Sequence, residues 1–152
     1  MTNRVLNFRE EISHKWEVVC KAVWIKYEKA SQKMSAEEKV VDIHSSPNTL
    51  EITKIKSIKF WWLKNYILVT QRFNFEKQIL EQRERSLFCS VGDLMSVKES
   101  AVYRAIKNKP VEYLKVFTDI PNSLIEANLK KCHTAGMDKL MELCSSFSLL
   151  VE

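Results

Sequence analysis

The sequence predicts an α+β domain. A curved antiparallel β-sheet of about six to seven strands wraps on a long C-terminal helix, with a short helix after the first strand, and encloses an apolar pocket. Short runs of alternating apolar and polar residues, separated by turn residues, fill the middle of the chain, and helical stripes occupy the two ends. A length of 152 residues favours a single domain over residues 1–152.

The first elements are a strand and a helix. Residues 5–12 alternate in polarity, which predicts a strand. A helix ending near Glu28 follows, because apolar residues recur there at the spacing of one helical face: Trp16, Val19, Cys20, Val23 and Tyr27. Residues 29–39 are polar and are expected to form a loop.

The middle of the chain predicts an antiparallel meander. Strand-like runs follow one another with turn residues between them, as at Ser45–Asn48 and Asn108–Pro110. The long run 61–75 is expected to break near Lys64-Asn65. The expected strands are 40–44, 50–58, 61–75, 78–89, 95–103 and 111–117.

The C-terminal segment predicts one long helix. Ser123 and Glu126 have the spacing of a capping box. Steps of three and four residues then continue for about 25–28 residues, or roughly 40 Å. The stripe consists of Ile125, Leu129, Cys132, Gly136, Leu140, Leu143 and Phe147. A helix with one apolar stripe must lie across an apolar surface, here the expected sheet.

The charge of the chain is concentrated in one segment. Basic and acidic side chains balance in residues 1–51 and again in 76–152, so the net charge of +5 arises in residues 52–75. This segment has no acidic residue but has Lys54, Lys56, Lys59, Lys64 and Arg72, interleaved with six aromatic residues. A basic, aromatic segment predicts an anionic partner, although lysines that protect a strand edge give the same pattern.

Several function classes are excluded or disfavoured. With only two glycines the chain cannot build a Gly-rich phosphate loop. The four cysteines form no C-x-x-C pair, and no metal or other cofactor is expected. The three histidines, His14, His44 and His133, have no evident catalytic partner in the sequence, so the protein is not expected to be an enzyme. No apolar run is long enough to span a membrane.

Lys54 is the strongest candidate binding residue on sequence grounds. It shares strand parity with Leu50, Ile52 and Ile58, so its side chain is expected to face the apolar side of the sheet. A charge in that position requires an anion.

The order of several motifs resembles the PRELI-like domain family, the phospholipid transfer proteins of the mitochondrial intermembrane space. The residues that carry the resemblance run over nearly the whole chain, from about Val5 to Leu150. They are Trp16, Val19 and Lys26-Tyr27 in the first helix, Lys39–Ile43, Asn48–Leu50 with Lys54-Ile55, Leu94–Tyr103, and Asn128–Lys131 with Gly136.

The resemblance implies a function. The chain would carry a glycerophospholipid of the phosphatidic acid or phosphatidylserine class between mitochondrial membranes, with the acyl chains in an apolar tunnel. The phosphate would lie on basic residues at the family's positions, which here are Lys26, Lys54, Lys56, Lys130 and Lys131. The implied partners are an anionic membrane surface and a small helical-hairpin protein with paired Cys-x9-Cys motifs, and the implied location is the intermembrane space.

The chain also departs from the family pattern. The prolines after the first helix are missing, and Lys54 replaces an arginine. The family's long lid over the lipid cavity is shortened to a short insert that would contact the membrane: Lys59, Phe60, Trp61, Trp62 and Lys64. The two tryptophans have two readings, as sheet-packing residues or as an interfacial anchor.

Three other functions remain open on the sequence alone. The chain could be a related helix-grip protein that binds sterols or other apolar molecules without a phosphate. It could also be a scaffold that binds the hairpin partner and no longer transfers lipid. The least favoured alternative is a nucleic-acid-binding module that uses residues 52–75 as a stacking strand; we expect no nucleic-acid partner.

Overall fold

The computed structural model describes residues 4–29, 35–60, 63–90, 92 and 96–151, with the side chains of these residues other than 26–29, 35–36, 60 and 149–151. Within these ranges seven strands form one antiparallel sheet in the order β1-β7-β6-β5-β4-β3-β2. The strands are β1 (Arg4–Ile12), β2 (Ser35–Ser46), β3 (Thr49–Phe60), β4 (Leu63–Asn74), β5 (Ile79–Cys89), β6 (Lys98–Arg104) and β7 (Val111–Ile120). The predicted meander is confirmed.

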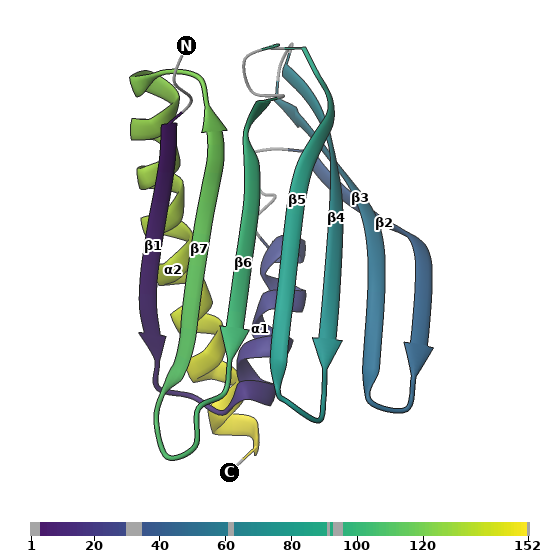
Figure 1. Cartoon of the computed structure of the whole chain (residues 1–152), viewed down its shortest axis with the longest axis vertical. Helices are drawn as coiled ribbons and strands as arrows, with labels where there is room; N and C mark the ends of the chain where they lie inside the picture. The colour runs from purple at the N-terminus through teal and green to yellow at the C-terminus, as the bar shows by residue number, and fades with distance from the viewer. Residues whose placement is uncertain (1–3, 30–34, 61–62, 91, 93–95, 152) are drawn as a thin grey trace.

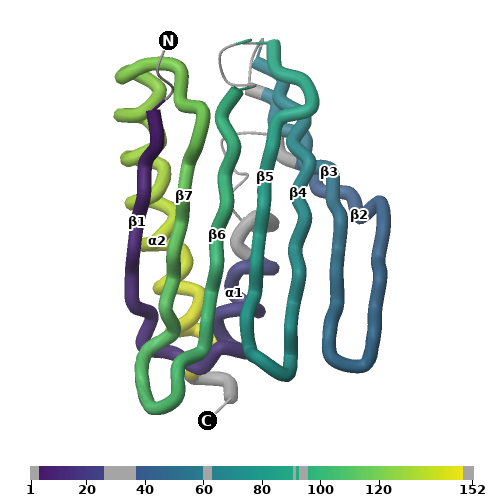
Figure 2. The backbone as a smooth tube through the Cα atoms, in the orientation of Figure 1, coloured from purple at the N-terminus to yellow at the C-terminus, as the bar shows by residue number. Residues whose placement is uncertain are grey.

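Two helices lie on the same side of this sheet, which we call its inner face (Figure 1). They are α1 (Trp16–Lys29) and α2 (Ser123–Val151). The sheet is twisted, so that the upper parts of β2 and β3 pass behind β4 in the view of Figure 2. No helix of the described chain covers the opposite, outer face (Figure 1). The α+β prediction is therefore confirmed, including the long C-terminal helix.

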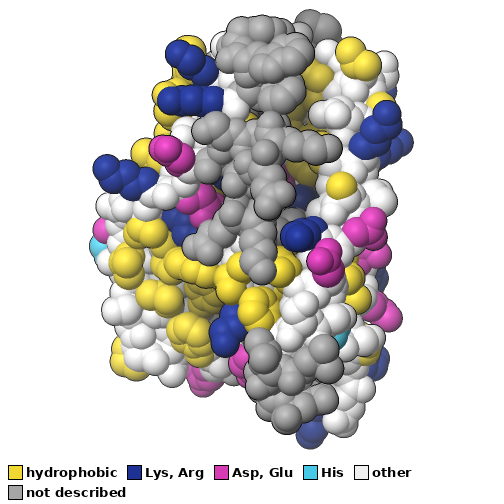
Figure 3. Space-filling view, turned by 180° about the vertical axis from the view of Figure 1, so that it is seen from behind, with side chains coloured by type: hydrophobic (Ala, Val, Ile, Leu, Met, Phe, Trp, Pro, Cys, Tyr) yellow, Lys and Arg dark blue, Asp and Glu magenta, His cyan; other side chains and the backbone are white. Residues whose placement is uncertain are grey.

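The hydrophobic core lies where α1 and the second half of α2 meet the inner face. Ile12, Trp16, Leu80 and Tyr113 are among its most buried members, and Leu140 supplies the contact from α2. Trp16 Nε1 also donates a hydrogen bond of 3.1 Å to the Tyr103 carbonyl, which ties α1 to β6. Figure 3, seen from behind Figure 1, shows hydrophobic side chains gathered in the lower half of the helix-bearing side.

The largest differences from the predicted strands concern β2 and β4. β2 begins at Ser35, inside the segment expected to be a loop, because its polar residues pair with the whole length of β3. The break expected near Lys64-Asn65 is also wrong, since both residues belong to β4 and pair with Lys59 and Ile58. The segment read as a shortened lid is thus mostly strand, and Trp61 and Trp62 lie outside the described residues.

The cap of α2 and one position of its buried stripe each differ from the prediction by one residue. Asn122, not Ser123, caps the helix: its Oδ1 accepts a hydrogen bond of 2.9 Å from the Ile125 N–H. Cys132, expected in the stripe, is exposed, and the neighbouring His133 takes the buried position. The stripe therefore includes an ionisable ring that the apolar pattern could not show.

Replacing the cap should weaken the fold by a measurable amount. We expect Asn122→Ala to lower the free energy of unfolding by about 1 kcal/mol, because a helix N–H loses its acceptor. Ser123→Ala is the matched control and should change it by less than about half as much. Urea denaturation followed by circular dichroism measures both values, and equal losses in the two variants would contradict the assignment of the cap.

Candidate functional site

Lys54 is buried on the inner face of β3, as the strand parity predicted. Its side chain is 2% exposed. The Nζ atom lies 3.6 Å from Glu38 Oε2 of β2 and 3.6 Å from the centroid of the Trp24 ring of α1. The anion that a buried ammonium requires is therefore supplied, at least in part, by the protein itself, with a cation–π contact from Trp24.

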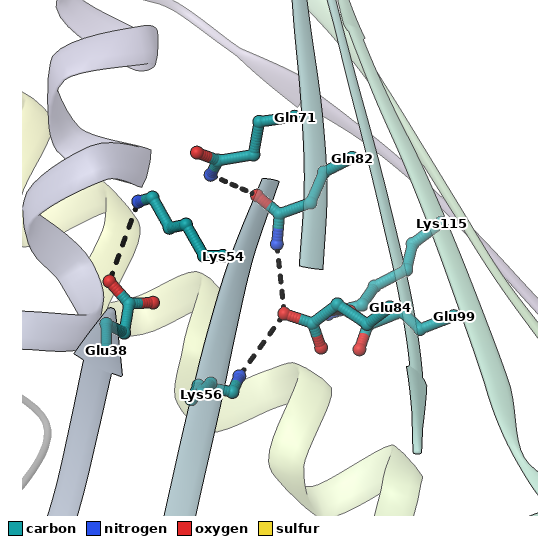
Figure 4. Close-up of polar contacts among 8 residues, drawn as sticks. All are labelled: Glu38, Lys54, Lys56, Gln71, Gln82, Glu84, Glu99 and Lys115. Carbon is teal, nitrogen blue, oxygen red and sulfur yellow. Dashed lines mark hydrogen bonds and ion pairs between the residues drawn. The ribbon is translucent and has the colours of Figure 1, made fainter. Parts of the chain in front are cut away.

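A second buried lysine anchors a chain of polar contacts across β3, β4 and β5 (Figure 4). Lys56, 6% exposed, lies with its Nζ 3.2 Å from Glu84 Oε1. Gln82 Nε2 donates to the same oxygen at 3.2 Å, and Gln71 Nε2 donates to Gln82 Oε1 at 2.9 Å. We call these residues the inner network: Glu38, Lys54, Lys56, Gln71, Gln82, Glu84, Glu99 and Lys115.

The Glu84 carboxylate fixes the orientation of both amides. Because a carboxylate only accepts, Gln82 must present its Nε2 to Glu84 and its Oε1 to Gln71. Gln71 Oε1 is then left as a buried acceptor that no donor among the described residues reaches. The network thus ends in an acceptor, not a donor.

Two carboxyl groups face each other at the centre of the sheet. Glu84 on β5 and Glu99 on β6 are directly opposite in register. Burial and the Glu84 charge raise the pKa of Glu99 to about 7, against the attraction of Lys115. For Glu84, burial acts to raise the pKa, but Lys56, Glu99 and Lys115 outweigh it and lower the pKa to about 2. A proton held between the two carboxyls therefore resides on Glu99.

Lys115 completes the inner network from β7. It forms an ion pair with Glu99 Oε1 and lies 5.2 Å from the centroid of the Phe117 ring. Burial acts to lower the pKa of Lys115, but the Glu99 carboxyl raises it above its usual range. The ammonium thus stays charged beside the carboxyl pair.

The two carboxyl-bearing residues border a partly open cavity of about 150 Å³ between the sheet and α2, which Arg85 also lines. One part of its lining is polar and includes Asn65 and Ser86, whose side chains are joined by a hydrogen bond of 2.8 Å. The other part is apolar and consists of Ile67, Val97, Phe117 and Leu129. The cavity can therefore receive a group with one polar and one apolar side.

The remaining predicted site residues do not join this cluster. Lys130 and Lys131 are exposed on α2. Lys59 and Lys64 are exposed and directly opposite each other at one end of the β3–β4 pair. The side chains of Lys26, Phe60, Trp61 and Trp62 lie outside the described residues.

The histidines have polar neighbours that the sequence did not reveal. His14 Nδ1 lies 2.8 Å from Ser148 Oγ, and His44 Nε2 lies 2.8 Å from Asp42 Oδ2. His133 is buried, stacks on the Phe8 ring at 3.7 Å between centroids and approaches Glu10 Oε1 at 3.4 Å. Ser148 and Glu10 are far from His14 and His133 in the sequence and meet them only through the fold, whereas Asp42 lies two residues from His44 on the same strand.

Three further observations bear on chemistry. In the described part of the chain, His, Cys, Asp and Glu side chains form no group of three that could hold a metal ion. Burial raises the pKa of the Cys20 and Cys144 thiols to about 12 and about 11. The described helices include none that is both long and apolar enough to cross a membrane.

Sequence reasoning missed Glu84, Glu99 and Lys115. The signal was present in the strand parity: Glu99 shares it with Ala101 and Tyr103, and Lys115 shares it with Tyr113 and Phe117. Tyr103, Tyr113 and Phe117 are all buried on the inner face. The charged residues between them should have been placed on the same inner face.

Comparison with known proteins identifies the fold but not a family. No protein-family model and no curated protein matches the sequence. The solved structure of Ara h 8.0201 is similar at a TM-score of 0.65 and 11% identity, over 95% of this chain and 99% of that one. The structure of the Zhui aromatase/cyclase from Streptomyces sp. R1128 is similar at a TM-score of 0.61 and 7% identity, over 95% of this chain and 94% of that one. The structure of norcoclaurine synthase from Thalictrum flavum is similar at a TM-score of 0.56 and 8% identity, over 97% of each chain.

These similarities define the chain as a helix-grip domain, in which a curved antiparallel sheet holds a long C-terminal helix. At this level of identity they establish the fold alone. The resemblance to the PRELI-like family stays a prediction.

The raised pKa of Glu99 should make stability depend on pH. The folded protein holds this proton more tightly than the unfolded chain, whose carboxyl has a pKa near 4.5. The stabilisation is therefore fully present below pH 4.5 and is lost as the pH rises through about 7. At about 1.4 kcal/mol per pKa unit, the loss amounts to at most a few kcal/mol.

Urea denaturation between pH 4.5 and 8 measures this slope. Glu99→Gln keeps the neutral shape and should flatten it, whereas Glu37→Gln, on an exposed residue of β2, controls for the change in net charge. A slope unchanged in Glu99→Gln would show that the carboxyl pair does not hold the proton.

Proposed function

We propose that the protein binds a small amphiphilic ligand in the cavity between the sheet and α2, without covalent chemistry. The observation that carries the proposal is the divided lining of this cavity, with a carboxyl pair on one part and apolar side chains on another. Burial of the ligand's apolar part would supply most of the binding energy, at about 0.8 kcal/mol per CH₂ group.

The polar lining favours a ligand that donates hydrogen bonds. Glu84 is an ionised carboxylate, and Asn65 Oδ1 already accepts from Ser86 Oγ. A hydroxyl or amino group would find acceptors there, whereas a phosphate oxygen would face the Glu84 charge. A cavity of about 150 Å³ holds a molecule of about benzene size, so we infer a small ring or one end of a longer molecule.

The fold is compatible with this proposal. The Thalictrum flavum norcoclaurine synthase similar to this chain is described in complex with a transition-state analogue, so a helix-grip protein of this shape accommodates a small molecule.

Phospholipid transfer between mitochondrial membranes is the more specific form of the proposal that the family resemblance implies. It would require a phosphate to displace Glu38 from Lys54 and Glu84 from Lys56. It would also require α2 to move outward, because two acyl chains exceed the cavity volume. The hairpin partner and the membrane contact through Lys59 and Lys64 belong to this form of the proposal.

The position of the lysines weakens the nucleic-acid alternative. Lys54 and Lys56 are buried on the inner face, so the basic stretch 52–75 loses two of its five cations as surface contacts. Strand β3, which the nucleic-acid alternative would use to contact bases, instead places these two lysines in the interior of the protein.

Filling the cavity should abolish ligand binding. We expect Leu129→Trp, which projects a large ring into the cavity, to weaken binding of a fluorescent amphiphile with a hydroxyl head group at least tenfold. Asn128→Trp adds the same ring to the exposed side of α2 and should change the affinity less than twofold. Fluorescence titration measures both, and equal affinities in the two variants would place the ligand elsewhere.

The phospholipid form makes a separate prediction. If Lys56 holds a phosphate, native mass spectrometry after incubation with mixed vesicles should show phosphatidic acid retained in preference to diacylglycerol. Lys56→Met should remove that preference. Retention of a hydroxyl-bearing amphiphile, with no preference for phosphatidic acid, would support the ligand site and reject the phospholipid cargo.

A further inference from the structure

The outer face of the sheet carries a hollow of about 320 Å³ that the proposed function does not use. Its polar lining comes from four adjacent strands, β4 to β7. Three side chains are cationic, Arg83, Arg85 and Lys98, and three carry hydroxyls, Thr70, Ser100 and Thr118. We call this site the outer hollow. Glu84 and Glu99 also border it, but their carboxyl groups belong to the inner network on the other face.

The register of the strands places like charges together in the outer hollow. Arg85 on β5 is directly opposite Lys98 on β6, and Arg83 lies between Thr70 and Ser100. Like charges directly opposite in a sheet repel each other and cost stability. An arrangement that brings cations together without an anion between them is therefore unfavourable by itself.

Carboxylates compensate little of this charge. Lys98 Nζ lies 3.5 Å from Asp119 Oδ2, in a solvent-exposed pair. For Arg83 and Arg85, the described residues provide no carboxylate within ion-pair distance. Two guanidinium groups are thus left with donors that point to solvent beside a concave surface.

On the same face, the charge of a neighbouring arginine is compensated by carboxylates on the adjacent strands. Arg72 on β4 is directly opposite Glu51 on β3 and Glu81 on β5, so its row alternates in charge. A smaller hollow of about 170 Å³ lies along this row and touches Arg83. The outer face therefore has one row in which an arginine lies between two carboxylates, and beyond it a pair of opposed cations, Arg85 and Lys98.

We propose that the outer hollow binds a phosphate-type oxyanion, either free or carried by a lipid headgroup. The anion would lie between Arg85 and Lys98 and remove their mutual repulsion. A guanidinium fork matches two oxygens of such a group, and the hydroxyls of Ser100 and Thr118 would donate to the others. This site opens on the opposite face of the sheet from the ligand cavity, and Glu84, Arg85 and Glu99 line both.

Calorimetric titration of the full chain with inorganic phosphate at low ionic strength tests the free anion. Flotation with phosphatidylcholine vesicles, with and without phosphatidic acid, tests the headgroup. The test variant is R83Q/R85Q, and R72Q is the matched control, because it removes one arginine of the same face from the compensated row.

We expect wild-type binding in at least one arm to be saturable, to fall at least tenfold in R83Q/R85Q and to change less than twofold in R72Q. Phosphate should also raise the thermal midpoint of the wild type and of R72Q but not that of R83Q/R85Q. Should the double variant fail to fold, R85Q alone gives the same comparison.

The outcomes distinguish a free anion from a lipid headgroup, and they also show whether the proposal itself fails. Binding of phosphate assigns the site to a free anion, and binding only to phosphatidic acid vesicles assigns it to a headgroup. Absence of wild-type binding in both arms, or an equal loss in R72Q and R83Q/R85Q, overturns the proposal. None of these results depends on the inner cavity, so Leu129→Trp should bind the anion like the wild type.

Discussion

The pairing of buried charges across the inner face is the constraint on which much of the structure depends. Lys56 of β3 pairs with Glu84 of β5, and Lys115 of β7 pairs with Glu99 of β6, so that the two carboxyl groups lie between two lysines in a largely buried region. An unpaired buried charge costs several kcal/mol. A one-residue slip of any of these strands would turn its charge to the outer face and leave its partner alone. The inner network therefore favours one register for the four central strands.

The same charges divide the interior into two parts. Near α1, Trp16, Leu80 and Leu140 pack into a continuous apolar core. Beneath the first half of α2, Glu84 and Glu99 take the inward positions, and their side chains are held by lysines on β3 and β7. Side chains committed to each other across the sheet cannot also fill the space beneath Leu129. The cavity is thus a consequence of the ion pairs, and its polar part consists of the groups that create it.

Much of the fold could be predicted from the sequence, and less of the site. Alternation and helical stripes are local signals, so the strands, the two helices and the inward position of Lys54 followed directly. The partner of Lys54 did not, because Glu38 belongs to a polar segment whose strand character comes only from pairing with β3. Glu99 and Lys115 were visible as inward positions, but their pairing depends on the order in which β6 and β7 join the sheet. Asn122 and His133 each differ from the expected residue by one position, a shift that hydrogen bonds and packing decide rather than composition.

The two faces of β5 show how one strand separates charge. In the sequence Gln82-Arg83-Glu84-Arg85, acid and amide point inward and both arginines point outward. Neighbouring opposite charges in the sequence therefore do not neutralise each other, because the strand places them on opposite faces. The inward carboxylate is matched by Lys56, and Glu99 by Lys115, so neither has charge left for the outer face. The arginines consequently contribute to the positive charge of the chain at the place where the sheet surface is hollow. The balance that the sequence shows over residues 76–152 conceals a polarised sheet, in which the inward lysines and carboxyl groups pair with each other and part of the outer face has an excess of basic side chains.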